Sequence, residues 1–88
     1  NVQSGDVSTQ IAAGDSYADY SVTFPTAFSG TPRVMLTPWT TTTTQANVVV
    51  PVLTAASATG FSFRVWRQYG TPTTSAPAPS IHWLAVQV

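Results

Sequence analysis

The side chains that could carry out chemistry in this chain are few. There is one histidine, His82, there is no cysteine, and the only acids are Asp6, Asp15 and Asp19. An enzyme needs an activated nucleophile, a pair of carboxylates with different roles, or a set of metal ligands. Asp15 and Asp19 share the same strand parity, but nothing in the surrounding sequence distinguishes one of them as a general acid. We therefore predict no catalytic residue and expect a protein that is not an enzyme.

The single histidine lies within an apolar stretch, SIHWLAVQV. One imidazole without a placed partner is best interpreted as a packed or interface histidine. The alternative is that three copies of His82 meet around a threefold axis and bind an ion. No other set of ligands is visible in the sequence, so we expect no metal and no cofactor.

Charged residues make up only 7% of the chain, and lysine is absent. A neutral chain with so little positive charge binds phosphates poorly, so neither nucleic acid nor an anionic membrane surface is an expected partner. The apolar runs are too short to span a membrane, and membrane insertion is not expected. Threonine, serine, alanine and proline replace the charged residues, which is typical of rigid β-structure that works outside the cell.

Strand patterns recur along the chain, separated by glycine, proline and threonine. We predict six strands, at Val2–Ile11, Tyr17–Phe24, Arg33–Trp39, Asn47–Thr54, Gly60–Tyr69 and Ser80–Val88. The composition of two segments predicts loops. Thr40–Gln45 joins the third strand to the fourth, and Gly70–Ser80 joins the fifth to the sixth. This pattern predicts an all-β fold, a six-stranded antiparallel β-sandwich, in a single domain over residues 1–88.

Alternation along these strands also predicts the core. We expect it to contain Tyr20, Val22, Phe24, Val34, Leu36, Phe61, Phe63, Val65, Trp83 and Ala85. Pro51 interrupts an otherwise regular strand, and proline cannot donate a ladder hydrogen bond. Its strand is therefore expected at a sheet edge or at a bulge.

The last strand is apolar on both faces. One face is predicted to carry Ile81, Trp83 and Ala85. The other carries His82, Leu84, Val86 and Val88. Leaving both faces of such strands in water would expose a large apolar patch, which monomers rarely do. We expect the second face to form an interface between copies of the chain; the alternative is that another part of the same protein covers it.

Five segments occur in an order that resembles the H-type lectin domain. They are NVQSG, VTFPTAF, TPRVML, ATGFSFRVW and IHWLAV. The family pattern has an opening Gln-Ser-Gly, a Val-Thr-Phe strand followed by Pro-x-Val, Thr-Gly-Phe entering the fifth strand, and a last strand with Trp-x-Ala. The resemblance covers nearly the whole chain. It implies a six-stranded antiparallel sandwich, a homotrimer and carbohydrate binding, and similar domains are common at the tips of bacteriophage tail fibres.

The resemblance also implies where a sugar would bind. The family uses a glycine and an aspartate in the loop before the second strand, which match Gly14 and Asp15. Its aromatic and basic contacts come from the end of the fifth strand, where this chain has Trp66, Arg67 and Tyr69. A carboxylate that accepts from paired hydroxyls and a ring against the sugar suit this task. The structural alternatives are an ordinary turn at Asp15 and interface packing for Trp66.

Two departures from the snail members of the family bear on specificity. The snail lectins place an arginine at the start of the fourth strand, where this chain has Asn47 or Val48. The amino-terminal loop of the snail lectins is also longer. The same sugar is therefore not expected, although Arg67 could replace the lost donor. The expected function is non-catalytic binding of host cell-surface carbohydrate by an extracellular domain at the tip of a phage tail fibre. The competing expectation is a trimeric cap or trimerisation module of a fibre that binds no ligand.

Overall fold

The computed structural model describes residues 2–12, 15–39, 48–67 and 79–87. These residues form β-strands and no helix. The strands are β1 (Val2–Ser8), β2 (Tyr17–Thr23), β3 (Arg33–Trp39), β4 (Val49–Ala56), β5 (Gly60–Arg67) and β6 (Ser80–Val86). The all-β class and the six predicted strands are thus confirmed.

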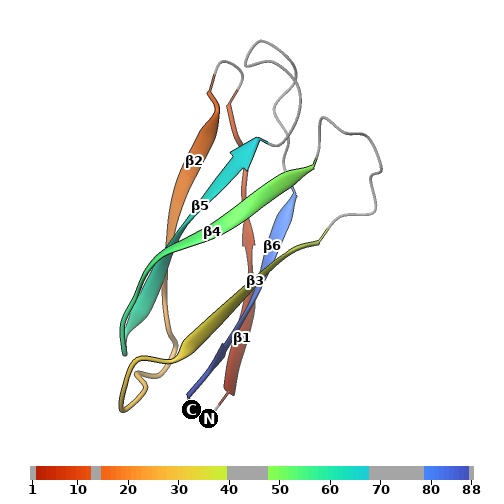
Figure 1. Ribbon diagram of the computed structural model, residues 1–88. Helices are drawn as coiled ribbons and strands as arrows, with labels where there is room; N and C mark the ends of the chain where they lie inside the picture. The colour runs from red at the N-terminus through yellow and green to blue at the C-terminus, as the bar shows by residue number, and fades with distance from the viewer. Residues whose placement is uncertain (1, 13–14, 40–47, 68–78, 88) are drawn as a thin grey trace.

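The strands form two antiparallel sheets of three strands each, ordered β1-β6-β3 and β2-β5-β4 (Figure 1). Among consecutive strands, only β4 and β5 are hydrogen-bonded neighbours; every other connection passes from one sheet to the other. The two sheets pack face to face as the predicted sandwich. Because Val2 pairs with Val86, the start of β1 and the end of β6 lie together at one end of the molecule.

The inward side chains of both sheets meet in one core. The buried apolar residues are Ile11, Phe24, Phe28, Val49, Phe61, Phe63, Val65, Ile81, Trp83 and Ala85. Partly buried residues that pack against them include Tyr20, Val22, Val34 and Leu36. The predicted core is therefore confirmed, and the structure adds residues outside the strands, such as Ile11 and Phe28.

Aromatic rings fill the centre of this core. Phe24, Phe28, Phe61 and Trp83 pack with ring centroids 5.0 to 5.7 Å apart, in the tilted and edge-on arrangements that aromatic pairs favour. Gly5 lies opposite Trp83 in the β1-β6 pair. The missing side chain at this position leaves room for the indole.

Two glutamines hold the segment between β2 and β3. The Gln3 side-chain amide donates to the Thr26 carbonyl oxygen at 2.7 Å. The Gln87 amide donates to the Ser29 hydroxyl at 2.5 Å. Two residues of the opening NVQSG motif, Gln3 and Gly5, thus have structural roles in the core and in the loop beside it.

The strand bounds differ from the prediction mainly at the first strand. β1 ends at Ser8 and not at Ile11. Directly after it, the backbone N–H and the hydroxyl of Thr9 both donate to the Pro79 carbonyl oxygen, at 3.3 and 2.7 Å. The chain therefore leaves the ladder there. The predicted strand residues Asn47, Tyr69 and Val88, and nearly all of the two predicted loops, lie outside the described residues.

Pro51 lies on an edge strand, as predicted, because β4 pairs only with β5. The pairing shifts register between Leu53 and Ala55, which is a bulge. Leu53 pairs with the core residue Phe63, yet its side chain is 38% exposed. A proline and a bulge on an edge strand both discourage pairing with another chain.

Candidate functional site

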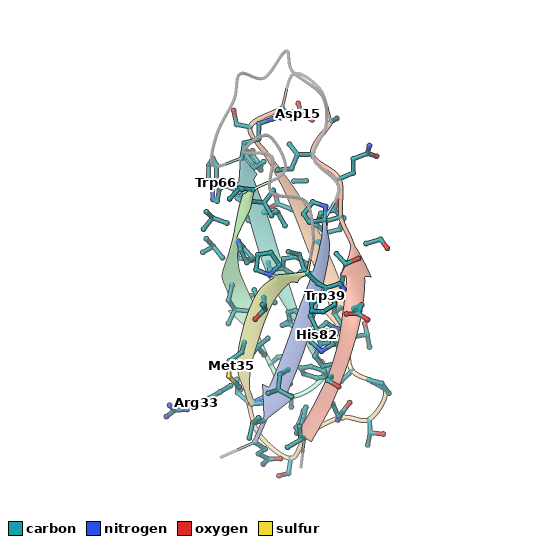
Figure 2. The ribbon with its side chains drawn as sticks, turned by 90° about the vertical axis from the view of Figure 1, so that its right-hand side faces the viewer. Asp15, Arg33, Met35, Trp39, Trp66 and His82 are labelled. Carbon is teal, nitrogen blue, oxygen red and sulfur yellow. The ribbon has the colours of Figure 1, made fainter. Side chains whose placement is uncertain are left out.

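The loop between β1 and β2 forms a tight turn at Asp15. The Asp15 backbone N–H donates to the Ala12 carbonyl oxygen at 3.0 Å, which closes the turn. The Asp15 side chain is exposed at the end of the molecule opposite the paired strand ends (Figure 2). Its carboxylate is thus accessible to a ligand, whereas the predicted neighbour Gly14 lies outside the described residues.

Arg67, at the end of β5, fastens this turn to the β2-β5-β4 sheet. Its guanidinium donates to the carbonyl oxygens of Asp15 at 2.7 Å and Ala12 at 3.1 Å. Its backbone N–H donates to the Ser16 carbonyl oxygen at 2.9 Å. The structure therefore brings two predicted site residues, Asp15 and Arg67, into direct contact from distant positions in the chain. The predicted ring of Tyr69 lies outside the described residues.

Trp66, the remaining predicted site residue, lies beside this turn on the outer face of β5. Its side chain is 39% exposed. Its ring centroid is 5.0 Å from that of Tyr17, its partner on β2. The Arg64 guanidinium lies 3.9 Å above the Tyr17 ring and 5.4 Å from that of Trp66. The Trp66 ring is therefore held by contacts within its own chain and is still partly exposed to solvent.

Asp19 completes this group of outer-face residues. Arg64 donates two hydrogen bonds to its carboxylate, at 2.7 and 3.1 Å. These hydrogen bonds lower the pKa of the Asp19 carboxyl and raise the pKa of the Arg64 guanidinium. A general acid needs a shift in the opposite direction. Asp19 is thus a structural partner of Arg64.

A hollow that the sequence did not indicate lies on the outer face of the β1-β6-β3 sheet. We call it the His82 hollow; it measures about 290 Å³ and is lined by Asp6, Trp39 and His82. Asp6 Oδ1 and His82 Nδ1 are 2.5 Å apart. Trp39 is 69% exposed, and Figure 2 shows its ring close to His82. The prediction for His82 was a packed or interface histidine, with an ion site on a threefold axis as the alternative, and the contributions of Asp6 and Trp39 were missed.

Four apolar side chains lie on the other half of the same face, in cross-strand rows that also contain Ser4 and Arg33. Val2 is 60% exposed and Met35 is 48% exposed. Between them, Leu84 and Val86 of β6 are partly buried. In register, Leu84 pairs with Met35 and Val86 pairs with Val2. We call these four residues the apolar rows. They include Leu84 and Val86 of the predicted interface, whose last member, Val88, lies outside the described residues.

Another hollow, of about 610 Å³, lies at the end where β1 starts and β6 ends. Its lining includes Gln3, Thr26, Ser29 and Gln87. Both glutamine amides are bonded to the neighbouring loop, and none of the described residues that line the hollow is acidic.

No group of three or more histidine, cysteine, aspartate or glutamate side chains in the described part of the chain could hold a metal ion. Within those same residues there is no helix long and apolar enough to cross a membrane.

No protein-family model and no curated protein matches the chain, but solved structures do. The chain is similar to part of the tailspike protein gp49 from Pseudomonas phage LKA1, with a TM-score of 0.79 and 28% identity over 97% of this chain. It is also similar to part of the Gp54 tailspike of Acinetobacter baumannii bacteriophage AP22, solved in complex with A. baumannii capsular saccharide. That match has a TM-score of 0.77 and 10% identity over 99% of this chain.

The chain spans only a small part of both tailspikes, 14% of the LKA1 protein and 17% of the AP22 protein. At 10% identity the AP22 match shows the shared fold alone. The LKA1 match supports a phage tail-associated domain, and both matches support the β-sandwich fold.

Proposed function

We propose that the chain is a non-catalytic carbohydrate-binding domain of a phage tail fibre or tailspike, and that it attaches the virion to host cell-surface glycans. The observation that carries the proposal is the match to the LKA1 tailspike over 97% of the chain at 28% identity. The AP22 tailspike was solved with a capsular saccharide, which supports glycans as the ligand class. The resemblance of the motifs to the H-type lectin domain supports the same class.

The sugar site of this proposal is the turn at Asp15. The exposed carboxylate of Asp15 accepts hydrogen bonds from a pair of hydroxyls, and Gly14 lets the sugar approach the backbone. Arg67 holds the turn through its hydrogen bonds to the carbonyl oxygens of Ala12 and Asp15. We expect Tyr69, which lies outside the described residues, to stack on the sugar ring, with Trp66 as a second ring beside the turn. A few hydrogen bonds and one ring face must offset the desolvation of hydroxyls, so each site binds weakly.

The proposed assembly is a homotrimer with the outer face of β6 at the axis. The exposed side chains of the apolar rows support this proposal, since a contact between subunits would remove them from water. A stable contact buries about 800 Å² per subunit. The predicted interface consists of His82, Leu84, Val86 and Val88, of which Val88 lies outside the described residues. Three weak sites on one trimer would raise avidity by roughly 10²–10⁴ over the affinity of a single site where glycans are dense.

The second candidate is a trimeric cap or trimerisation module of a fibre without ligand binding. The apolar rows favour it, because they serve assembly whether or not a sugar binds. The two candidates differ in whether a sugar binds at the turn at Asp15, and binding there can be measured.

The test is binding of the wild type and of the Asp15→Ala and Tyr69→Ala variants to host cells and to a glycan array. We expect both variants to remain assembled by light scattering and to lose attachment. A chelator should leave binding intact, since the proposal includes no metal. If both variants bind as well as the wild type, the site assignment is wrong. If the wild type binds nothing, the structural module is the better description.

A further inference from the structure

We propose that the His82 hollow is a second saccharide site, which binds a neutral pyranose ring between Trp39 and the Asp6–His82 pair. This inference rests on the proposed glycan-binding function but concerns a different surface. The turn at Asp15 lies between β1 and β2, whereas the His82 hollow lies on the outer face of the β1-β6-β3 sheet (Figure 2).

The backbone ladder places the three side chains. Asp6 on β1 and His82 on β6 are register partners. Trp39, at the end of β3, pairs with Ser80, two residues before His82 on the same face of β6. Each residue therefore comes from a different strand of one continuous sheet. A site held by paired strands is ordered before the ligand arrives, which lowers the entropic cost of binding.

The polar groups suit hydroxyl recognition. His82 uses Nδ1 for its contact with Asp6 Oδ1, so Nε2 is the ring nitrogen that remains for a ligand. Asp6 keeps its second carboxylate oxygen as an acceptor. A sugar hydroxyl both donates and accepts, so neighbouring hydroxyls on one ring can meet the carboxylate and the imidazole together.

Trp39 supplies the apolar half of the site. At 69% exposed it has the highest exposure of the large hydrophobic residues described. An indole has a broad apolar face with one polar N–H. That face matches the C–H face of a pyranose, while the hydroxyls around the ring point to Asp6 and His82. The hollow, of about 290 Å³, is large enough for a monosaccharide unit and leaves the remainder of a glycan chain in solvent.

The charge around the hollow favours a neutral sugar. The chain has three arginines and no lysine. Arg33 lies at the far end of the same face, opposite Val86, and Arg64 and Arg67 belong to the other sheet. A carboxylate or sulfate on the glycan would approach the Asp6 carboxylate with no arginine or lysine beside it. Uronic and sialic acids are therefore disfavoured.

The composition of the face argues against a subunit contact at the hollow, so this inference removes His82 from the predicted trimer interface and leaves Leu84 and Val86 in it. Two further cross-strand rows lie on this face, nearer the end with the turn at Asp15, and both carry polar residues. One contains Asp6, His82 and Thr37. The other contains Ser8 and Ser80, with Trp39 at the edge. Interface cores are depleted of charged residues, and burying the Asp6–His82 pair would cost the solvation of both groups. The apolar rows can contact another subunit while these two further rows remain open as a groove.

The test compares Trp39→Ala, Asp6→Ala and Trp39→Phe with Val52→Ala, an exposed apolar truncation on the other sheet, as the control. The probes are an array of neutral pyranosides and a matching array of sialosides and glucuronides, with light scattering of every variant. We expect the wild type to prefer the neutral array. Trp39→Ala and Asp6→Ala should bind about tenfold more weakly, while Trp39→Phe keeps most of the affinity and all variants keep the assembly of the wild type.

Three results would overturn the inference. If Trp39→Ala and Asp6→Ala bind like the wild type while Asp15→Ala does not, this second site is wrong and the proposed function stands. If Trp39→Ala dissociates the assembly, Trp39 is a subunit contact. If the wild type binds neither array nor host cells, the proposed function fails and this inference fails with it.

Discussion

The indole of Trp83 occupies the space that a side chain at Gly5 would need. A Cβ built at Gly5 would lie 2.9 Å from Trp83 Nε1 and 3.0 Å from Cε2 and Cζ2. Trp83 is only 4% exposed, and rings of Phe24 and Phe61 pack against it. The indole therefore has little room to move away, and glycine is required by close packing.

We expect Gly5→Ala to destabilise the fold by about 1–3 kcal/mol, the usual cost of overpacking a core. Thermal unfolding followed by circular dichroism measures the change. Gly30→Ala is the matched control, because a Cβ there would meet only the Gln87 amide nitrogen, at 3.6 Å. If the two variants unfold at the same temperature, the indole is not confined as described.

The second prediction concerns assembly. Leu84→Asp would place a charge among the apolar rows, and an unpaired charge buried in an interface is strongly destabilising. We expect light scattering to show monomers for this variant and trimers for the wild type. Leu53→Asp, an equal change on the β4 edge, should leave the trimer intact. A trimeric Leu84→Asp protein, or a monomeric wild type at high concentration, would rule out this interface.

The third prediction concerns the turn at Asp15. Arg67→Ala removes the hydrogen bonds to the carbonyl oxygens of Ala12 and Asp15. We expect the Asp15 amide, which closes the turn, to exchange its hydrogen at least several-fold faster, since local opening becomes easier. Arg33→Ala, in β3 on the other sheet, should leave that rate unchanged. Unchanged exchange in Arg67→Ala would mean that the turn holds without the guanidinium.

The fourth prediction concerns acid. Because the pKa of Asp19 is lowered in the folded chain by Arg64, the pair stabilises the fold above the ordinary aspartate value of about 3.9. That contribution is lost as the pH falls through the lower, folded value. The melting temperature of the wild type should therefore drop more steeply than that of Asp19→Asn between about pH 4 and pH 2. The difference is small because the pair is exposed. Arg64→Met should give the same flattened profile, and parallel profiles for all three proteins would contradict the assignment.

Most of the fold could be predicted because alternation along the strands dominates it. The ends of β3 and the inward residues Phe61, Phe63 and Val65 follow from period-2 patterning alone. Leu53 departs from that pattern because of the bulge in β4, which alternation does not reveal. The motif residues Gln3 and Gly5 were interpreted only as part of a family pattern, and the structure assigns them packing roles.

The candidate sites were harder to predict because they depend on register. Asp6 and His82 are separated by 76 positions, and Arg67 and Asp15 by 52. Sliding one strand by two residues would keep every side chain on its own face and still separate each pair. Hydrophobic patterning therefore predicts the faces, whereas the pairs that could bind a ligand appear only once the ladder is known.

The pairing of Val2 with Val86 has a mechanical consequence. Attachment would load the domain along its strands from opposite ends. The virion would pull at the end where β1 starts and β6 ends, and a bound host glycan would pull at the turn at Asp15. Antiparallel ladder hydrogen bonds run perpendicular to the strands. Such a load would therefore strain many of them together, as shear. Pulling on both chain ends would instead open the β1-β6 pair one hydrogen bond at a time. The domain should thus resist force best in the direction in which attachment applies it.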